Sequence, residues 1–358
     1  MEAIFWFSVG FIAYVYVGYP LLLGVWAAVA PREREAPVSG DRLPGVTIII
    51  AARNEARRLP ARIENLLASD YPRDRLQIVI ASDGSTDDTV DALAPYARWI
   101  DLIMLPPGGK ARALNAAVAH AAHPILVFAD ARQQFAPDAI PRLVRHFSKL
   151  SVGAVSGELV LDCEQGASRS TVGDGLGAYW KYEKWLRRRE AIVGSTLGVT
   201  GAIYAMRRSL WEPLPPDTIL DDVLGPMRVV LRRHRVIFDA TALAFDEAAS
   251  HAGAELRRKV RTLAGNFQLL TLEPRLLVPV VNPVWLQFVS HKLARLLVPY
   301  ALVALLAASA WLARESMLYA SAFAAQLLFY GLAAYGALLD RRERGTAAPS
   351  AEVMREAA

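Results

Sequence analysis

The chain has 358 residues, of which 54% are hydrophobic, and a formal net charge of +5. A mean hydropathy of +0.24 is high for a soluble enzyme, and the apolar excess lies at residues 4–30 and beyond residue 275. Cys163 is the only cysteine, which excludes an intrachain disulfide. Known basic-aromatic nucleic-acid modules are missing from the sequence, so the basic balance predicts contact with a lipid bilayer or an anionic substrate and with no nucleic acid.

The first apolar stretch, residues 4–30, contains no Lys, Arg, Asp or Glu and is long enough to cross a bilayer. A signal peptide would have a basic start and a shorter apolar core, whereas Glu2 is the only charge before this stretch. We therefore expect a transmembrane helix over residues 4–30. Arg32 and Arg34 follow, and by the positive-inside rule they place the next part of the chain in the cytoplasm.

Strand and helix patterns alternate after a short polar linker. Strands are expected at residues 46–52, 76–81, 100–105 and 125–129, and helices at 60–67, 86–96, 110–120 and 137–147. This alternation predicts an α/β fold with a mostly parallel, doubly wound sheet. Further on, strands are expected at 152–161 and 200–206, and helices at 179–190, 219–231 and 256–270. Together these elements define a cytoplasmic domain over residues 44–270.

The C-terminal part returns to apolar sequence. Residues 276–289 are apolar but short and contain two prolines, which predicts an interfacial segment. Residues 296–313 and 317–339 predict two more transmembrane helices, and residues 345–358 a disordered tail. This three-span arrangement keeps the basic clusters at 291–295 and 341–344 on the cytoplasmic side.

Polar residues follow three of the predicted strands where those strands end. Asn54 and Glu55 follow the first, Asp83 the second, and Asp130 the apolar run Ile125–Ala129. In open α/β sheets ligands bind outside the carboxyl ends of the strands. One shared ligand site would explain all three positions, and three separate capping turns would also explain them.

A second group of residues has the chemistry to hold a phosphate. Gly108, Gly109 and Lys110 begin a helix, where backbone N–H groups and the helix dipole favour anions. The pattern is not a P-loop, since Lys110 precedes Ala111 instead of Ser or Thr. The alternative is an exposed basic helix start.

Two further clusters lie in the second half of the domain. Asp221 and Asp222 are adjacent, and neighbours on a helix diverge by about 100°, so one can act as a general base while the other is structural. The helix carrying Arg258 and Arg261 is either a solvated face or a site that neutralises a diphosphate. Trp180 and its aromatic neighbours are expected in the core more than as a sugar platform.

Together these motifs resemble the family 2 inverting glycosyltransferases, the group that contains the cellulose, chitin and hyaluronan synthases. The resemblance covers about residues 44–270, and the flanking membrane spans also match. It implies a GT-A-like fold, in which Asn54, Glu55 and Asp83 line the nucleotide pocket and Lys110 approaches the diphosphate. Asp130 matches the first residue of the Asp-x-Asp motif and is the implied ligand of Mg²⁺ or Mn²⁺.

The same resemblance assigns the later motifs. Leu220-Asp221-Asp222 matches the Thr-Glu-Asp motif, which makes Asp222 the implied base and puts Asp221 in the substrate site. Arg258 to Thr262 matches the Gln-x-x-Arg-Trp motif, which gives Arg258 and Arg261 catalytic roles.

Three departures from the family pattern affect these expectations. Arg132 replaces the second Asp of Asp-x-Asp, so it cannot bind a metal, although its guanidinium is suited to contact substrate phosphate. Arg258 replaces Gln, and Thr262 replaces the Trp that looks onto the acceptor in polymer synthases. The first departure puts the metal site in question, and the other two put processive polymer synthesis in question.

The expected function is transfer of a sugar, with inversion, from a nucleoside-diphosphate sugar to a lipid or glycan acceptor. A UDP-sugar is the expected donor, and cell-envelope or exopolysaccharide synthesis the expected setting. The expected location is the inner (plasma) membrane, as a multi-pass protein with a cytoplasmic catalytic domain. A sugar-nucleotide nucleotidyltransferase and a catalytically silent membrane scaffold of the same fold are the alternatives.

Overall fold

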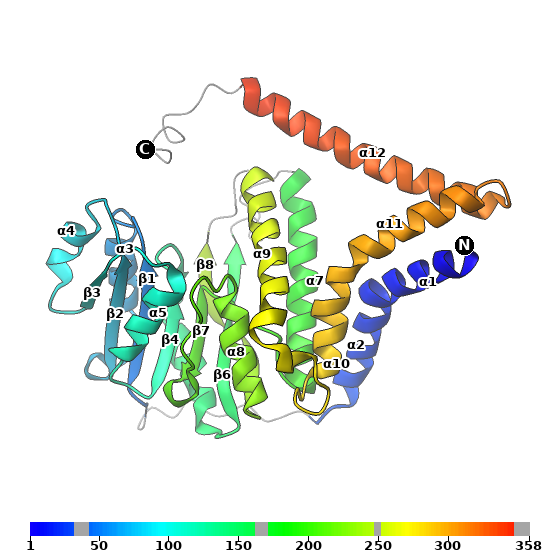
Figure 1. Cartoon of the computed structure of the whole chain (residues 1–358). Coiled ribbons are helices and arrows are strands. Elements are labelled where there is room, and N and C mark those ends of the chain that lie inside the picture. The colour runs from blue at the N-terminus through cyan, green and yellow to red at the C-terminus, as the bar shows by residue number, and fades with distance from the viewer. Residues whose placement is uncertain (32–42, 162–170, 247–251, 347–358) are drawn as a thin grey trace. The chain divides into compact units, whose positions relative to one another are not determined.

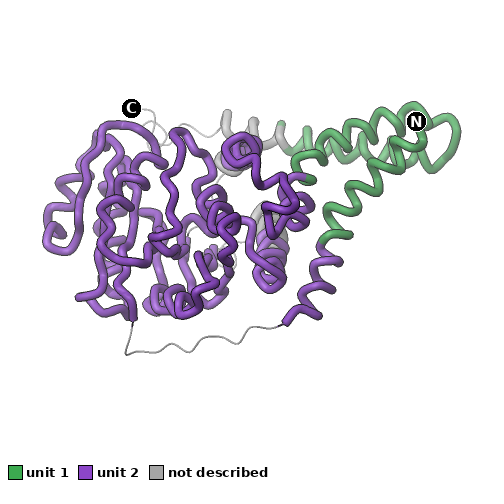
Figure 2. Tube along the Cα trace, turned by 60° about the horizontal axis from the view of Figure 1, so that its bottom comes forward, with its two compact units in different colours: residues 1–19, 294–358 green, residues 20–293 purple. Residues whose placement is uncertain are grey.

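The computed structural model describes residues 1–31, 43–161, 171–246 and 252–346 and divides into two compact units (Figure 2). Unit 2 comprises residues 20–293, and unit 1 comprises residues 1–19 with 294–358. Arg32, Arg34, Cys163 and residues 347–358 of the predicted tail lie outside the described residues.

Unit 2 is built on a mixed sheet. In the described chain eight strands form it, in the order β3-β2-β1-β4-β7-β6-β8-β5 (Figure 1). The strands are β1 (Val46–Ala52), β2 (Leu76–Asp83), β3 (Asp101–Leu105), β4 (Ile125–Ala129), β5 (Gln134–Phe135), β6 (Val152–Leu161), β7 (Ile203–Arg207) and β8 (Arg235–Asp246).

The strand directions bring several strand ends to one edge. Strands β1 to β4 run parallel, β7 is antiparallel to both β4 and β6, β8 is parallel to β6, and β5 is antiparallel to β8. The predicted α/β fold is confirmed, with one half of the sheet fully parallel. Because β6 and β8 point the same way as β4, their carboxyl ends share an edge with the start of β7.

Helices cover both faces of this sheet. Helices α3 (Leu59–Leu67) and α6 (Ala139–Val144) pack on one face, where Ile48 and Ile50 point, and α5 (Lys110–Ala119) and α8 (Asp221–Leu231) pack on the other with Ile49. Burial on both faces is the physical reason that β1 reads as apolar from Ile48 to Ala52.

The remaining helices differ from expectation in length. They are α4 (Thr89–Leu93), α7 (Thr171–Val193) and α9 (Ala252–Leu272), with 3₁₀ turns at Arg73–Arg75, Ala94–Tyr96, Arg145–Ser148, Arg208–Leu210 and Pro274–Leu277. The helix expected from residue 86 begins only at Thr89. The carboxylate of Asp87 accepts hydrogen bonds from the backbone N–H groups of Ala56 (3.2 Å) and Thr89 (3.1 Å). These bonds hold Asp87 in the loop before α4, where the sequence predicted the first turn of the helix.

Strand β8 was not expected from the sequence. Its pairing with β6 shifts register between Ser156↔Phe238 and Glu158↔Leu243, so a regular alternation of apolar and polar residues is lost there. The carboxylate of Asp239, which is 5% exposed, stabilises this irregularity by accepting from the backbone N–H of Thr241 (2.9 Å).

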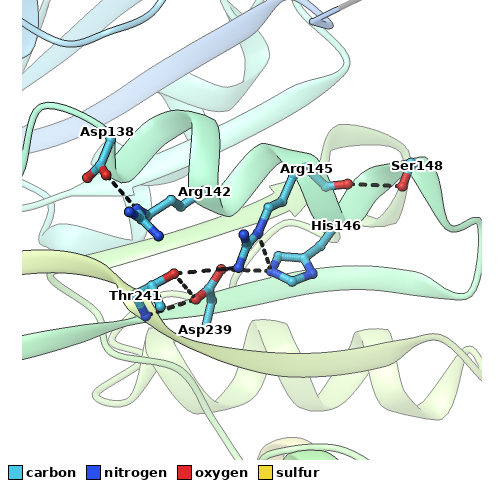
Figure 3. A network of polar contacts seen from close by, with 7 residues as sticks. All are labelled: Asp138, Arg142, Arg145, His146, Ser148, Asp239 and Thr241. Atoms are coloured by element: carbon cyan, nitrogen blue, oxygen red, sulfur yellow. Dashed lines mark hydrogen bonds and ion pairs between the residues drawn. The ribbon is translucent and has the colours of Figure 1, made fainter. Parts of the chain in front are cut away.

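A polar cluster joins this part of β8 to the turn after α6 (Figure 3). The guanidinium of Arg145 lies 2.9 Å and the ring of His146 2.8 Å from the carboxylate of Asp239. Burial alone would raise the pKa of Asp239. The hydrogen bonds from His146 and Thr241 and the charge of Arg145 outweigh burial and hold this pKa well below its ordinary value.

We expect Asp239→Ala to lower the free energy of unfolding by about 3 kcal/mol at pH 7, the typical cost of breaking a buried ion pair. A carboxyl with a depressed pKa stabilises the fold above its unfolded pKa of about 3.9 and loses that effect as the pH falls below it. The difference between wild type and variant should therefore shrink below pH 4 in denaturation of the purified chain. Asp138→Ala, which breaks the more exposed pair with Arg142 (2.6 Å), is the matched control and should cost little. Equal losses for both variants would contradict this prediction.

Apolar helices make up most of what remains of the described residues. They are α1 (Glu2–Ala13), α2 (Tyr19–Val29), α10 (Trp285–Gln287), α11 (Ala294–Leu312) and α12 (Met317–Thr346), with π-helical turns at Tyr14–Gly18 and Phe288–Leu293. Within unit 1, Phe5 packs with Ala308, Leu312 and Tyr319. Three helices of the described chain are long and apolar enough to cross a membrane: Glu2–Val29, Trp285–Leu312 and Met317–Gly336.

The second of these helices begins earlier than the expected residue 296. It starts at Trp285, so it takes in the end of the segment 276–289 that was expected to lie at the interface. From the sequence, this membrane span was expected to begin only after the charged residues near 291. In the structure His291 is 6% exposed and pairs with Glu190 (2.6 Å) and Glu183 (3.4 Å) of α7, so a polar residue continues the helix without being left unpaired.

Candidate active site

A cavity of about 440 Å³ lies at the carboxyl edge of the sheet, wholly within unit 2. Its walls come from the ends of β4, β6 and β8, the segment before β7, the start of α8, and helices α7 and α9. Seven of the ten predicted site residues line it: Lys110, Asp130, Arg132, Asp221, Asp222, Arg258 and Arg261. The structure therefore brings together residues that are up to 151 positions apart in the chain.

Lys110 bridges two carboxylates in this cavity. Its Nζ lies 3.4 Å from Oδ1 of Asp130 and 3.3 Å from Oδ2 of Asp221. Burial alone would lower the pKa of Lys110, but the charges of Asp221, Asp130 and Asp222 outweigh burial and raise this pKa above its ordinary value. The ammonium therefore stays protonated and provides a fixed positive charge beside Asp130.

Asp83 lies outside the cavity and fixes the loop before Lys110. Its carboxylate is 5% exposed and accepts hydrogen bonds from the backbone N–H groups of Gly108 (2.7 Å) and Gly109 (2.9 Å). Gly109 has a φ of +85°, a conformation that favours glycine. Both oxygens of Asp83 are engaged with this loop, and its expected contact with a nucleotide stays a prediction.

Asn54 and Glu55 also lie outside the cavity, in the loop after β1. Oδ1 of Asn54 accepts from the backbone N–H of Thr86 (2.8 Å), and the backbone N–H of Glu55 donates to the hydroxyl of Thr89 (3.0 Å). These bonds join the loop after β1 to the loop after β2. The nucleotide-binding role expected for both residues stays a prediction.

Asp221 and Asp222 point in different directions at the start of α8. Asp221 is buried against Lys110, whereas Asp222 has no salt bridge or hydrogen bond from its side chain among the described residues. Burial and the neighbouring Asp221 raise the pKa of Asp222 to about 6, against the opposite influence of Lys110, Lys292 and Arg187. An accessible carboxylate with a raised pKa is the property that a general base needs near neutral pH.

Arg132 is held by an acidic residue that the sequence analysis missed. Its guanidinium lies 2.5 Å from the carboxylate of Asp246, at the end of β8, and Nε2 of Gln133 donates to the same carboxylate (2.8 Å). Asp246 follows Ala242–Phe245, which is the same signal, a charge after an apolar run, that singled out Asp130. Asp246 would have been predicted as a site residue only if strand β8 had been predicted from the sequence.

Helices α7 and α9 supply another part of the cavity wall. The guanidinium of Arg258 lies over the ring of Trp180, 5.3 Å from its centre. Trp180 lines the cavity, whereas the sequence favoured a place in the core. Lys184 of α7 pairs with Glu158 of β6 (3.1 Å). The acids Glu158, Glu183 and Glu190 were not predicted, because neither the strand pattern around Glu158 nor the basic helix pattern around the other two marks which carboxylates face a ligand.

Charged side chains of opposite sign are balanced in the cavity. Among the described residues, seven Lys and Arg side chains line it, and so do seven Asp and Glu side chains. An incoming diphosphate therefore adds negative charge that the protein does not offset, and a divalent cation would offset it.

The residues present fit a divalent cation only in part. The described residues contain no group of three or more His, Cys, Asp or Glu placed to hold one. Asp130, however, is 39% exposed at its side chain and faces the cavity, and Mg²⁺ is often bound by one or two carboxylates plus substrate phosphates. The donor set therefore fits a cation that arrives with the substrate.

Known proteins resemble this chain in sequence. Residues 47–212 match the family described as Glycosyl transferase family 2. The chain is 26% identical, over 70% of its length, to beta-monoglucosyldiacylglycerol synthase of Nostoc sp., and 22% identical, over 66%, to poly-beta-1,6-N-acetyl-D-glucosamine synthase of Staphylococcus aureus. The aligned regions cover 56% and 58% of those two proteins, so the chain spans just over half of their length.

A solved structure resembles nearly the whole chain. The mannosyltransferase PcManGT from Pyrobaculum calidifontis, in complex with GDP-Man and Mn²⁺, is 25% identical with a TM-score of 0.70. The similarity covers 93% of this chain and 91% of that one. It includes the GT-A domain and extends beyond the residues matched by the family.

Proposed function

Since this chain carries a family 2 glycosyltransferase domain with a GT-A fold, we propose that it transfers a sugar from a nucleoside-diphosphate sugar to a lipid or glycan acceptor, with inversion. The observation that carries the proposal is the convergence of Lys110, Asp130 and Asp222 in one cavity. A cation, an exposed carboxylate and a base are the groups that displacement of a nucleoside diphosphate requires.

The proposed reaction is a single in-line displacement at the anomeric carbon. The acceptor hydroxyl gives its proton to the carboxylate of Asp222 while its oxygen bonds to that carbon. The bond from this carbon to the phosphate oxygen breaks, and its electron pair leaves with the nucleoside diphosphate. Lys110, Arg258 and Arg261 line the cavity and are placed to stabilise the charge that develops on the leaving group.

Asp130 is the residue proposed to hold Mg²⁺ or Mn²⁺, together with oxygens of the donor. Such an ion would neutralise charge on the diphosphate. The neutral cavity and the exposure of Asp130 support this proposal. Arg132, which replaces the second Asp of the Asp-x-Asp motif, is paired with Asp246 and would supply no second ligand to the metal.

The acceptor class draws support from the relatives. The name of the Nostoc protein describes a synthase of a glucosylated diacylglycerol, and that of the Staphylococcus protein a synthase of a polysaccharide. Both suit cell-envelope or exopolysaccharide synthesis. A UDP-sugar remains the proposed donor, although PcManGT is complexed with GDP-Man.

Product analysis tests this function directly. Membranes containing the chain are supplied with a panel of UDP- and GDP-sugars, and products are identified by mass spectrometry alongside released phosphate species. A new glycoside with release of nucleoside diphosphate is expected. Release of pyrophosphate would point to a nucleotidyltransferase, and binding without turnover of any donor would indicate a silent scaffold; either result would overturn the proposal.

The proposed location is the inner (plasma) membrane, with three spans, the N-terminus outside and the catalytic domain in the cytoplasm. The three apolar helices and the placement of basic residues support this arrangement. Ala313→Cys, between α11 and α12, should react with an impermeant thiol reagent from outside intact cells in a Cys163→Ala background. Labelling of this site only after lysis would rule out the three-span arrangement.

A further inference from the structure

Lys292 is a charged residue that a largely apolar helix brings to the active site. It lies in the π-helical turn Phe288–Leu293, near the start of the candidate membrane span Trp285–Leu312, and its side chain lines the cavity. Single π-helical turns are rare and occur frequently at functional sites. The reaction proposed above does not use Lys292, so its position calls for an explanation of its own.

Arg187 of α7 is a second cation on the same part of the cavity wall. Its guanidinium donates to the hydroxyl of Thr200 (3.1 Å), and a Cβ placed on the next residue, Gly201, would lie 3.5 Å from Oδ2 of Asp222. Arg187 therefore lies close to the proposed base. Lys292 is close to both residues as well, since it is repelled by the charge of Arg187 and attracted by that of Asp222.

The other carboxylates near Lys292 already have a partner. Glu183 and Glu190 also attract Lys292, but they are bound to His291, which lies 3.4 Å and 2.6 Å from them. In the part of the chain that the structure describes, neither Arg187 nor Lys292 forms a salt bridge. Two neighbouring cations without a salt bridge in a partly buried site cost free energy, and an anion bound between them would remove this cost.

We propose that Arg187 and Lys292 bind a phosphate group of the acceptor, and that this acceptor is a phospholipid whose headgroup carries the accepting hydroxyl. The inference rests on the proposed function and names its acceptor class. Guanidinium and ammonium groups are common ligands of phosphate. The phosphate itself is unchanged: the headgroup hydroxyl gives its proton to Asp222, its oxygen bonds to the anomeric carbon, and the nucleoside diphosphate leaves with the electron pair.

The position of Lys292 along its helix favours a lipid over a free phosphate. A helix needs about 20 residues to cross the hydrocarbon core of a bilayer, and counting back about 20 residues from Leu312 reaches Leu293. In the proposed three-span arrangement, Lys292 therefore lies where the helix enters the headgroup layer. A phospholipid can present its phosphate at this level while its acyl chains remain in the bilayer.

The test measures binding of a short-chain phospholipid to the full-length chain in neutral detergent by calorimetry. Dihexanoylphosphatidylglycerol is compared with its methyl phosphotriester, which has the same hydroxyls and acyl chains but no charge. The wild type should bind the charged diester more tightly. Lys292→Met and Arg187→Met should each weaken binding of the diester by about 10–100-fold, the range for loss of a hydrogen bond to a charged group. Both should leave binding of the triester unchanged, and Lys292→Arg should retain affinity for the diester.

Lys181→Met is the matched control, because Lys181 is an exposed cation of α7 that does not line the cavity, and its loss should change neither affinity. Equal binding of diester and triester by the wild type would overturn the proposal. Equal losses for both lipids in the variants would do the same, because they would show that the cations act on the fold or on the base. A loss of donor affinity in place of lipid affinity would assign the cations to the donor diphosphate and would also overturn it.

Two further measurements separate the source of the phosphate and the proposed function itself. Inorganic phosphate that competes as well as the diester at equal concentration would overturn the assignment to a lipid. With a sugar nucleotide supplied, mass spectrometry should show faster conversion of the diester than of the triester to a glycoside, and equal rates would contradict the proposal. Selective binding of the diester without transfer from any donor would count against the proposed function and leave the phosphate site standing.

Discussion

Asp222→Asn is expected to lower turnover by about 10²–10⁴-fold, the range that a positioned general base contributes. The amide keeps the shape of the side chain and removes its basicity, so donor affinity should be unchanged. Turnover is measured by release of nucleoside diphosphate, and donor affinity by calorimetry on the same preparation.

Asp221→Asn is the matched control for this substitution. Asp221 pairs with Lys110 (3.3 Å), so its replacement should disturb donor binding and leave the base in place. A variant Asp222→Asn with normal turnover, together with an inactive Asp221→Asn, would show that the roles of the two residues are reversed.

The pH dependence of the wild type follows from the same residue. Burial and the neighbouring Asp221 raise the pKa of Asp222 to about 6, and only the ionised form accepts a proton. The value of kcat/KM should therefore rise with pH through about 6, and this limb should be missing from the residual activity of Asp222→Asn. An unchanged limb in the variant would assign the titration to another group.

The second large effect is expected at the proposed metal site. Chelation with EDTA should abolish activity, and Mg²⁺ or Mn²⁺ should restore it. Asp130→Ala should lower turnover by about 10³-fold, since a metal ion supplies several kcal/mol of charge stabilisation. Initial rates in metal-buffered assays provide the measurement.

Arg132→Ala is the internal comparison for the metal prediction. The guanidinium of Arg132 is bound to Asp246 (2.5 Å), so we expect its loss to cost less than the loss of Asp130. Full activity in EDTA, combined with a severe defect in Arg132→Ala, would show that the arginine has taken over the role of the metal.

The parts of the site that could be predicted from sequence are those that directly follow a strong local pattern. Asp130 follows an unbroken apolar strand, and Lys110 follows two glycines at a helix start; both line the cavity. Asp83 shows the limit of this reasoning. It follows a strand in the same way, yet it bonds to Gly108 and Gly109, because a strand end reveals the edge but not the partner.

Long-range pairing accounts for most of what the sequence did not reveal. Asp246 lies at the end of a strand whose register shift obscured its pattern, and it meets Arg132 across 114 positions. His291 belongs to a basic cluster that the sequence placed before the span 296–313, and only its contacts with Glu183 and Glu190 show why the helix runs through it. Such pairs depend on tertiary packing, which no local window contains.

The balance of charges in the cavity bears on how its ligands enter. Seven cationic and seven acidic side chains of the described part of the chain line it. In such a cavity the positive and negative charges balance one another within the protein. An incoming anion must therefore either displace one of these internal counter-ions or enter with a cation of its own. Lys110 pairs with two carboxylates, so its single charge cannot balance both of them and an incoming diphosphate. The species that binds is therefore expected to be the complex of the sugar nucleotide with its cation. The nucleoside diphosphate is expected to leave with the same cation bound.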